Sequence, residues 1–247
     1  MQIDVVTIFP KMFQSPFESG VVAKALQKGL VQFHFHNLRD YTTDKHQTVD
    51  DVPFGGGGGL VFKVAPLVRA LRDIKKAEMK SRSILVSPRG EPFSHDKAQA
   101  LSEYDQLILF CGRYEGVDER FSDYVDEEIS IGDYVLTGGE IPAMVLMDAV
   151  CRFIPGVVGQ LQGPHQDSFS RLNETLLEHP HYTRPRCFED KSVPGVLISG
   201  NHAGIEAWKR GARRNITLQR RPDLLKKAQL FEAVEDIHGR KIRDKQS

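Results

Sequence analysis

The chain has 247 residues and equal numbers of acidic and basic side chains, and its 40% hydrophobic and 27% charged residues are usual for a globular protein. No apolar run approaches the roughly 18 residues that a membrane helix needs, and the N-terminal MQIDVVTIFP lacks the basic and apolar regions of a signal peptide. Cys111, Cys151 and Cys187 are odd in number and form no CxxC pair, so we expect a reducing cytoplasm and neither a disulfide framework nor a zinc site.

Charge is unevenly distributed along the chain. Residues 1–170 contain 17 basic and 23 acidic side chains, whereas residues 171–247 contain 16 basic and 10 acidic ones. An acidic body with a basic tail indicates two units and a tail that contacts a polyanion. Chance variation of charge between two halves is the alternative.

Strand and helix patterns alternate through the first part of the chain. Strands are expected at 3–9, 31–38, 83–87, 106–112 and 128–140. Helices are expected at 21–30, 65–79, 94–104 and 141–153, with Ser94 as the cap of the third. This alternation predicts a layered α/β fold with a parallel sheet.

The pattern changes at 154–168, where glycine, proline and glutamine crowd together as in a linker or mobile loop. Beyond it we expect a single strand at 193–199 and helices at 202–214 and 221–235. The sequence therefore predicts a first domain at 1–158, a connecting loop at 159–170 and a C-terminal domain at 171–247.

Five consecutive glycines stand in the stretch PFGGGGGLVF at 53–62. No Lys-Ser/Thr follows them, so they are not a nucleotide-binding P-loop, and the apolar residues on both sides argue against a bare linker. We expect a loop whose backbone lies against another element or a ligand.

Three further glycine-bearing turns each follow or end a predicted strand: SPRGE, CGRYEG and IGDYVLTGGE. Ligands of parallel α/β sheets bind at the carboxyl ends of strands, and glycines there allow close approach of the backbone. One such turn is weak support for a site, but three predict one shared ligand site. None has the GxGxxG pattern, which disfavours NAD.

The chain resembles the bacterial tRNA (guanine-N1)-methyltransferases, which modify the guanosine just 3′ of the anticodon. The resemblance rests on PFGGGGGLVFK, VSPRGE, LFCGRYEGVDERF, SIGDYVLTGGEIPAMVLMDAVCRFIPGVVG, HPHYTRP and VLISGNHAGIEAWK, which stand in the family's order from about residue 1 to 225. It departs from the family in Gly58 and Leu60, where relatives usually carry proline and methionine, and in Glu178, where aspartate is common.

The resemblance implies a fold of the SPOUT class: a parallel-sheet domain with a deep trefoil knot and a small, mostly helical C-terminal domain. It also implies S-adenosylmethionine as methyl donor, a tRNA anticodon stem-loop as substrate, and a homodimer with active sites at the subunit interface. The cofactor-binding residues carried over are Leu85, Val86, Ser87, Pro88, Gly90, Gly112, Tyr114, Glu115, Gly116, Ser130, Ile131, Gly132, Asp133, Tyr134, Val135, Leu136, Gly138, Gly139 and Pro142.

Three catalytic residues also follow from the resemblance. Asp167 corresponds to the general base for the guanine N1 proton, although an Asp before Ser otherwise caps a helix. Arg152 is assigned to guanine O6 or a phosphate, although it is also spaced for a surface ion pair with Asp148. Glu115 orients the base or helps to bind Mg²⁺, although it could instead pair with Arg113 or Arg120.

The basic run KRGARRNITLQRR at 209–221 is either a solvated helix face or a contact for tRNA phosphates, and together with the basic tail it favours tRNA. The expected tRNA-binding residues are Arg184, Lys209, Arg213, Arg214, Arg220 and Arg221. His34/His36 and His179/His181 are the histidine pairs with regular spacing, and we expect the second pair to pack or to contact RNA. The metal ligands stay open.

Two other functions remain to be distinguished. A SPOUT enzyme acting on a ribose 2′-hydroxyl would not need Asp167 as a base for N1. An RNA-binding protein that had lost catalysis would be expected to lose Asp167, Arg152 or the cofactor glycines, and the chain has all of them.

Overall fold

The structure is a computed structural model that describes residues 1–159 and 163–226. The chain divides into two compact units, Met1–Leu161 and Gln162–Ser247. Within the described ranges, no helix combines the length and the apolar character that crossing a membrane requires.

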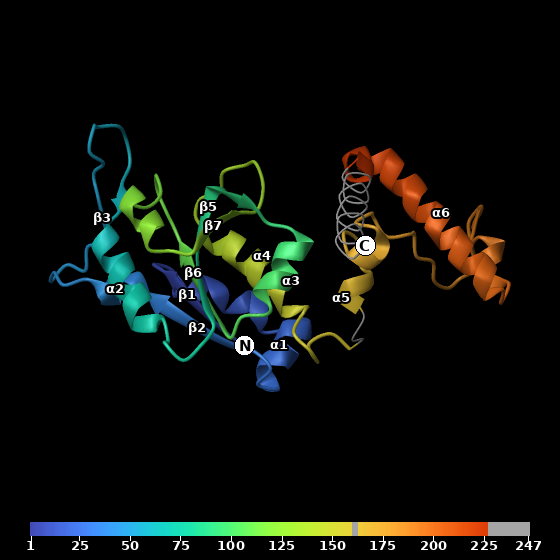
Figure 1. Cartoon of the computed structure of the whole chain (residues 1–247), viewed down its shortest axis with the longest axis horizontal. Coiled ribbons are helices and arrows are strands. Elements are labelled where there is room, and N and C mark those ends of the chain that lie inside the picture. The colour runs from blue at the N-terminus through green and yellow to red at the C-terminus, as the bar shows by residue number, and fades with distance from the viewer. Residues whose placement is uncertain (160–162, 227–247) are drawn as a thin grey trace, which may run out of the picture. The chain divides into compact units, whose positions relative to one another are not determined.

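A five-stranded parallel sheet forms the centre of the first unit, with strand order β2-β1-β6-β5-β7 (Figure 1). Its strands are β1 (Gln2–Thr7), β2 (Gln32–Asn37), β5 (Ser81–Pro92), β6 (Gln106–Cys111) and β7 (Glu127–Ser130). Every residue of β6 is buried, as expected for a central parallel strand that is covered on both faces.

Helices cover both faces of the sheet and create two cores. Alternate strand residues such as Val5, Ile84 and Leu109 pack with one set of helices, and their neighbours pack on the other side. The first core receives α1 (Gly20–Gln27), α3 (His95–Leu101) and α4 (Glu140–Cys151), and the second receives α2 (Val64–Ile74). In Figure 1, α2 accordingly stands on the opposite side of the sheet from α3 and α4.

Short elements connect these parts. A two-stranded antiparallel ribbon, β3 (Asp50–Asp51) with β4 (Val61–Phe62), brackets the glycine run. The 3-10 helices of this unit are η1 (Pro10–Phe13), η2 (Ser15–Phe17), η3 (Leu38–Tyr41) and η4 (Glu119–Asp123).

The second unit has a single long helix, α6 (His202–Arg220), among its described residues. The others are the short helix α5 (Gly163–Gln166), the 3-10 helices η5 (Arg171–Asn173) and η6 (Gly195–Ile198), and the ribbon β8 (Cys187–Phe188) with β9 (Lys191–Ser192). The chain is helical again at 222–226, and the rest of the helix expected at 221–235 lies outside the described residues.

The α/β class and the parallel sheet are confirmed, as is the cap of α3, where Ser94 Oγ accepts a hydrogen bond from the Lys97 amide at 3.2 Å. One strand prediction was wrong, and another is confirmed only as a short strand that ends in the expected turn. The apolar run at 193–199 forms η6 instead, because Pro194 introduces a tight turn in which the Leu197 amide donates to the Pro194 carbonyl. The strand expected at 128–140 ends at Ser130, where the Ser130 hydroxyl bonds to the Gly132 backbone and Gly132 takes a φ of +141°.

Candidate functional site

A cavity of about 1310 Å³ lies in the first unit, where β5, β6 and β7 end. These strands are neighbours in the order β6-β5-β7, so the turns that follow them meet at one edge of the sheet. All three glycine-bearing turns contribute to its wall, as does the loop that carries the glycine run. The three turns that were expected to share a ligand site therefore line one cavity.

The first turn is a bulge within β5. Val86 and Glu91 both face Ile129 of β7, so the residues between them leave the sheet and project toward the cavity. Gly90 closes this bulge: a Cβ at its position would overlap the backbone of Ile129. Gly90 does not line the cavity, and its contribution is the close backbone approach that returns the strand to the sheet.

The second and third turns are joined to each other. Arg113 and Gly138 form an antiparallel bridge, and the Gly139 amide donates to the Gly112 carbonyl at 2.9 Å. A side chain at Gly138 would overlap Arg113, and a Cβ at Gly139 would lie 2.8 Å from Cα of Cys111. The two glycines therefore allow the N-terminus of α4 to lie directly against the end of β6.

A buried ion pair holds this junction. Nε of Arg113 is 2.9 Å from Oε2 of Glu140, although the two are not aligned as a hydrogen bond, and the Glu140 side chain is only 1% exposed. The Thr7 hydroxyl donates to the other carboxylate oxygen at 2.8 Å, and the guanidinium donates to the Thr137 carbonyl at 3.1 Å. Glu140 thus connects β1, α4 and the turn after β6.

This ion pair also decides one alternative for Glu115. Arg113 pairs with Glu140 and Arg120 pairs with Asp118 at 2.6 Å, so neither arginine pairs with Glu115. Glu115 is exposed and lines the cavity.

The glycine run ends against the same turn. The Glu115 amide donates to the Leu60 carbonyl at 3.1 Å, and a Cβ at Gly59 would lie 2.7 Å from the Glu115 carboxylate. Gly55 to Gly58, in contrast, have open space around their missing Cβ positions. The expectation of a loop lying against another element holds for Gly59, and the preceding glycines are needed for their backbone angles, since Gly55, Gly56 and Gly57 all have positive φ.

Aromatic rings stand at the mouth of the cavity. Tyr114 and Tyr134 both line it, and their side chains are 53% and 55% exposed, so neither is a core residue. Tyr114 has a φ of +59° and packs edge-on against Phe62. Exposed rings beside a mainly apolar cavity are suited to pack on a flat heterocycle.

Of the 19 residues expected to bind cofactor, 17 line the cavity, and the two that do not are Gly90 and Asp133. Buried Cys111 also stands at the end of β6, but burial and the nearby Glu140 carboxylate raise the pKa of its thiol well above the usual value. A buried thiol of this kind stays protonated, which is typical of a structural cysteine.

The structure distributes the three predicted catalytic residues over both units. Glu115 and Arg152 belong to the first unit, and Asp167 belongs to the second. Arg152 is exposed at the C-terminal end of α4 and is not part of the cavity wall. Asp167 is half-buried and directly follows α5, and the next helical turn, η5, is preceded by Ser170, so Asp167 is not its cap.

The segment around Asp167 is fixed by its own unit. The Asp167 carbonyl accepts from the Asn173 amide group at 3.0 Å, and the Ser168 hydroxyl accepts from the Glu178 amide at 2.9 Å. One residue before Glu178, the Leu177 amide donates to the Thr217 hydroxyl on α6 at 3.1 Å. Asp167 is therefore linked through a short hydrogen-bonded segment to the long helix.

The basic run forms the second half of α6. Lys209, Arg213 and Arg220 follow the i, i+4, i+11 spacing that places side chains on one side of a helix. Two cations of the set have carboxylate partners on this helix or near it: Lys209 pairs with Glu206 at 2.8 Å and Arg214 with Glu174 at 3.0 Å. Arg221, which follows the helix, pairs with Asp223, and Arg184 is exposed in the preceding loop.

Several cavity residues were not anticipated. The wall also includes Asp51, Pro53 and Phe54 beside the glycine run, and Arg89 and Asp118 in the turns. Interpreting the whole stretch DDVPFGGGGG as a ligand-binding loop would have predicted Asp51, Pro53 and Phe54. The Arg113–Glu140 pair joins residues 27 positions apart and leaves no signal in the sequence.

Comparisons with known proteins identify the family. Residues 1–227 match the family described as tRNA (Guanine-1)-methyltransferase TrmD. A tRNA (guanine-N(1)-)-methyltransferase of Geobacter sulfurreducens is 50% identical over 237 residues, covering 96% of each chain. The proteins of the same name from Dictyoglomus turgidum and Thermosipho africanus are 51% and 49% identical and cover 96% of this chain, which in turn covers 96% and 94% of them.

Proposed function

The chain belongs to the tRNA (guanine-N1)-methyltransferase family, and we propose that it methylates N1 of the guanosine at tRNA position 37, immediately 3′ of the anticodon. The activity in this family's name requires a methyl donor, and the family implies S-adenosylmethionine. The observation that carries the proposal is the cavity at the ends of β5, β6 and β7, whose wall includes most residues of the family's three binding turns.

The cavity suits this donor. Gly112, Gly116 and Gly132 line the cavity without adding side chains to it, while Leu85, Leu136 and the tyrosines supply apolar surface for an adenine ring. A Cβ at Gly116 would point into open space, so the missing side chain keeps that part of the site free. When bound, S-adenosylmethionine supplies the methyl group of its sulfonium, and the sulfur is left as a neutral thioether.

The chain's own residues would handle the guanine. Asp167 would accept the N1 proton on its carboxylate as the bond from N1 to the methyl carbon forms and the carbon–sulfur bond breaks. Arg152 would stabilise the negative charge that develops on O6, since a guanidinium offers a fork of donors. Glu115, at the cavity wall beside Gly59, would orient the base relative to the donor.

No step of this mechanism is assigned to Mg²⁺, which only the resemblance implied. The ion prefers oxygen ligands, often one or two carboxylates together with substrate phosphates. The group of three potential metal ligands found within the described residues is instead histidine-rich and lies in the second unit. We derive no step through Mg²⁺.

The finer features that the resemblance implies complete the proposal. They are a deep trefoil knot in the sheet domain, a homodimer whose active sites contain residues of both subunits, a cytoplasmic location, and tRNA phosphates held by the basic side chains of α6. A homodimer would explain why the three catalytic residues come from two units, because a partner could bring Asp167 to the cavity of the other chain.

The test is methyl transfer from labelled S-adenosylmethionine to a tRNA transcript with guanosine at position 37, beside a transcript with adenosine there. We expect N1-methylguanosine in the first and no label in the second, by nucleoside analysis after digestion. Label on a ribose, or equal label in both transcripts, would contradict the proposed atom and position.

A further inference from the structure

Three potential metal ligands come together in the second unit, on the segment 178–181 at the start of the HPHYTRP stretch. Ligand atoms of Glu178, His179 and His181 all lie within 4.8 Å of one another. The sequence spacing favoured packing or RNA contact for the two histidines, because it did not show that the carboxylate faces them.

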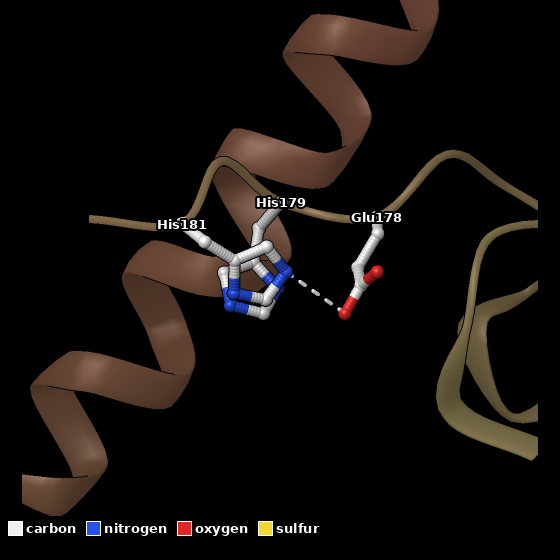
Figure 2. A group of neighbouring side chains, drawn as sticks. All are labelled: Glu178, His179 and His181. Carbon is white, nitrogen blue, oxygen red and sulfur yellow. Dashed lines mark ion pairs between the residues drawn. The ribbon is translucent and has the colours of Figure 1, made fainter. Parts of the chain in front are cut away.

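The side chains point into one common space. Nε2 of His181 is 3.0 Å from Oε1 of Glu178, and the two imidazole rings lie 4.6 Å apart at an angle of 47°. Figure 2 shows both rings and the carboxylate on the same side of the segment, with α6 passing behind them.

One ring nitrogen of this group lacks a partner. Nδ1 of His179 is shielded from water and makes no hydrogen bond within the part of the chain that the structure describes. A buried polar atom without a partner is destabilising, because it has lost its hydrogen bonds to water and gained none in the protein. An ion held among the three side chains would form a bond to a ring nitrogen of His179, a residue whose polar atoms are otherwise incompletely satisfied.

The donor set selects the class of ion. Two imidazoles and one carboxylate, with a fourth position left to water, are the ligands of many zinc sites, and nitrogen donors suit Zn²⁺, Ni²⁺ and Cu²⁺ better than Mg²⁺ or Ca²⁺. Zinc–ligand bonds of about 2.0–2.2 Å require the donor atoms to approach by roughly 1 Å. His181 and Glu178 can make this movement, because their side chains are 67% and 32% exposed.

The backbone of the segment is already restrained. Pro180 stands between the two histidines and fixes its own φ, which lowers the entropy lost on binding. The Leu177 amide bonds to Thr217, and the rings of His179 and Tyr182 contact Trp208, both on α6. Lys209 and Arg213 also act on His179 electrostatically, so we expect moderate rather than very tight affinity.

We propose that Glu178, His179 and His181 form a binding site for one divalent transition-metal ion of the Zn²⁺ type. The bound ion would cross-link the three side chains of the segment 178–181, which lies beside α6. None of the three residues lines the cavity of the first unit. The metal-site proposal does not depend on the methyl-transfer proposal.

The chain offers its own reporter for this site. Trp208 is the single tryptophan of the sequence, and the centre of its ring system lies 6.4 Å from that of His179. Paramagnetic Cu²⁺ or Ni²⁺ bound to His179 should therefore quench its fluorescence. The experiment titrates the full chain, freed of metal by a chelator, with CuCl₂ or NiCl₂ alone, and measures ZnCl₂ binding by calorimetry.

We expect saturable quenching at one ion per chain, reversed by excess Zn²⁺ and weakened at least tenfold in His181→Gln, whose side chain is 67% exposed. Glu178→Gln should give a smaller loss in the same direction. His202→Gln, an exposed histidine of the same unit, is the matched control and should bind as the unaltered chain does. Equal quenching in His181→Gln and the unaltered chain, or no saturable binding of Zn²⁺, would overturn the proposal.

Discussion

Gly139 offers a sharp test of how the cavity at the ends of β5, β6 and β7 is built. It caps α4 with an ordinary φ of −78°, so an alanine there causes no backbone strain by itself. Its Cβ, however, would lie 2.8 Å from Cα of Cys111 and 3.1 Å from N of Gly112. Both are backbone atoms at the end of β6, and neither can rotate away.

The N-terminus of α4 must therefore move by several tenths of an ångström in Gly139→Ala. Such overpacking costs about 1–3 kcal/mol, and each kcal/mol lowers Tm by about 2–4 °C in a chain of this size. The movement would also lengthen the hydrogen bond from Gly139 to Gly112 that joins two turns of the cavity. We expect both a lower Tm and weaker binding of S-adenosylmethionine.

Circular dichroism on heating measures the first effect, and calorimetric titration with S-adenosylmethionine measures the second. Gly58→Ala is the matched control: Gly58 also lies in a loop of the first unit, but its Cβ would meet nothing within 4 Å. A control that loses as much stability as Gly139→Ala, or a Gly139→Ala variant with unchanged Tm and affinity, would refute the argument from close approach.

Three further outcomes are expected. Arg152→Ala should lower the single-turnover rate of methyl transfer by about 10²–10³-fold and leave the affinity for S-adenosylmethionine unchanged, and a rate near that of the unaltered enzyme would remove Arg152 from catalysis. Glu140→Gln should reduce the free energy of unfolding by about 3 kcal/mol in urea, because it leaves the Arg113 guanidinium without its buried carboxylate, and unaltered stability would show that the pair is neutral. Burial alone would raise the pKa of Asp4, but hydrogen bonds from His36, Gln106 and Gln2 outweigh it and hold the pKa below its usual value. Asp4 should thus stabilise the fold above about pH 4, and this contribution should disappear in urea titrations as the pH falls through the lower folded-state pKa; an Asp4→Asn variant with the same acid dependence would contradict this.

Sequence patterns predicted the parts of the fold that depend on local periodicity. The apolar run at 106–112 is typical of a buried parallel strand, and the apolar spacing after residue 65 is typical of a helix that packs on a sheet; these segments form β6 and α2. The same reasoning failed at 193–199, where an apolar composition resembles a strand but Pro194 and the lack of a pairing strand favour a 3-10 turn. Composition alone does not show whether a neighbour is available for pairing.

The candidate site divides in the same way. Glycines after strand ends are visible in the sequence, and they marked the turns that line the cavity. The side-chain contacts of those turns could not be predicted. Glu140 contacts Arg113 and Thr7 because β1 and β6 are neighbours in the sheet, and the sequence does not show the order of the strands. The group Glu178, His179 and His181 could not be predicted either. In an irregular segment, side-chain directions follow no regular period, so sequence spacing does not show which side chains face one another.

Proton removal by Asp167 is the central claim, and Asp167→Asn tests it most directly. The measurement is the single-turnover rate of transfer to guanosine-37 tRNA at saturating S-adenosylmethionine, with the affinities for tRNA and donor measured separately. We expect a rate lower by about 10²–10⁴-fold with both affinities unchanged, because the asparagine amide cannot accept the N1 proton. A rate close to that of the unaltered enzyme would contradict it and require another base.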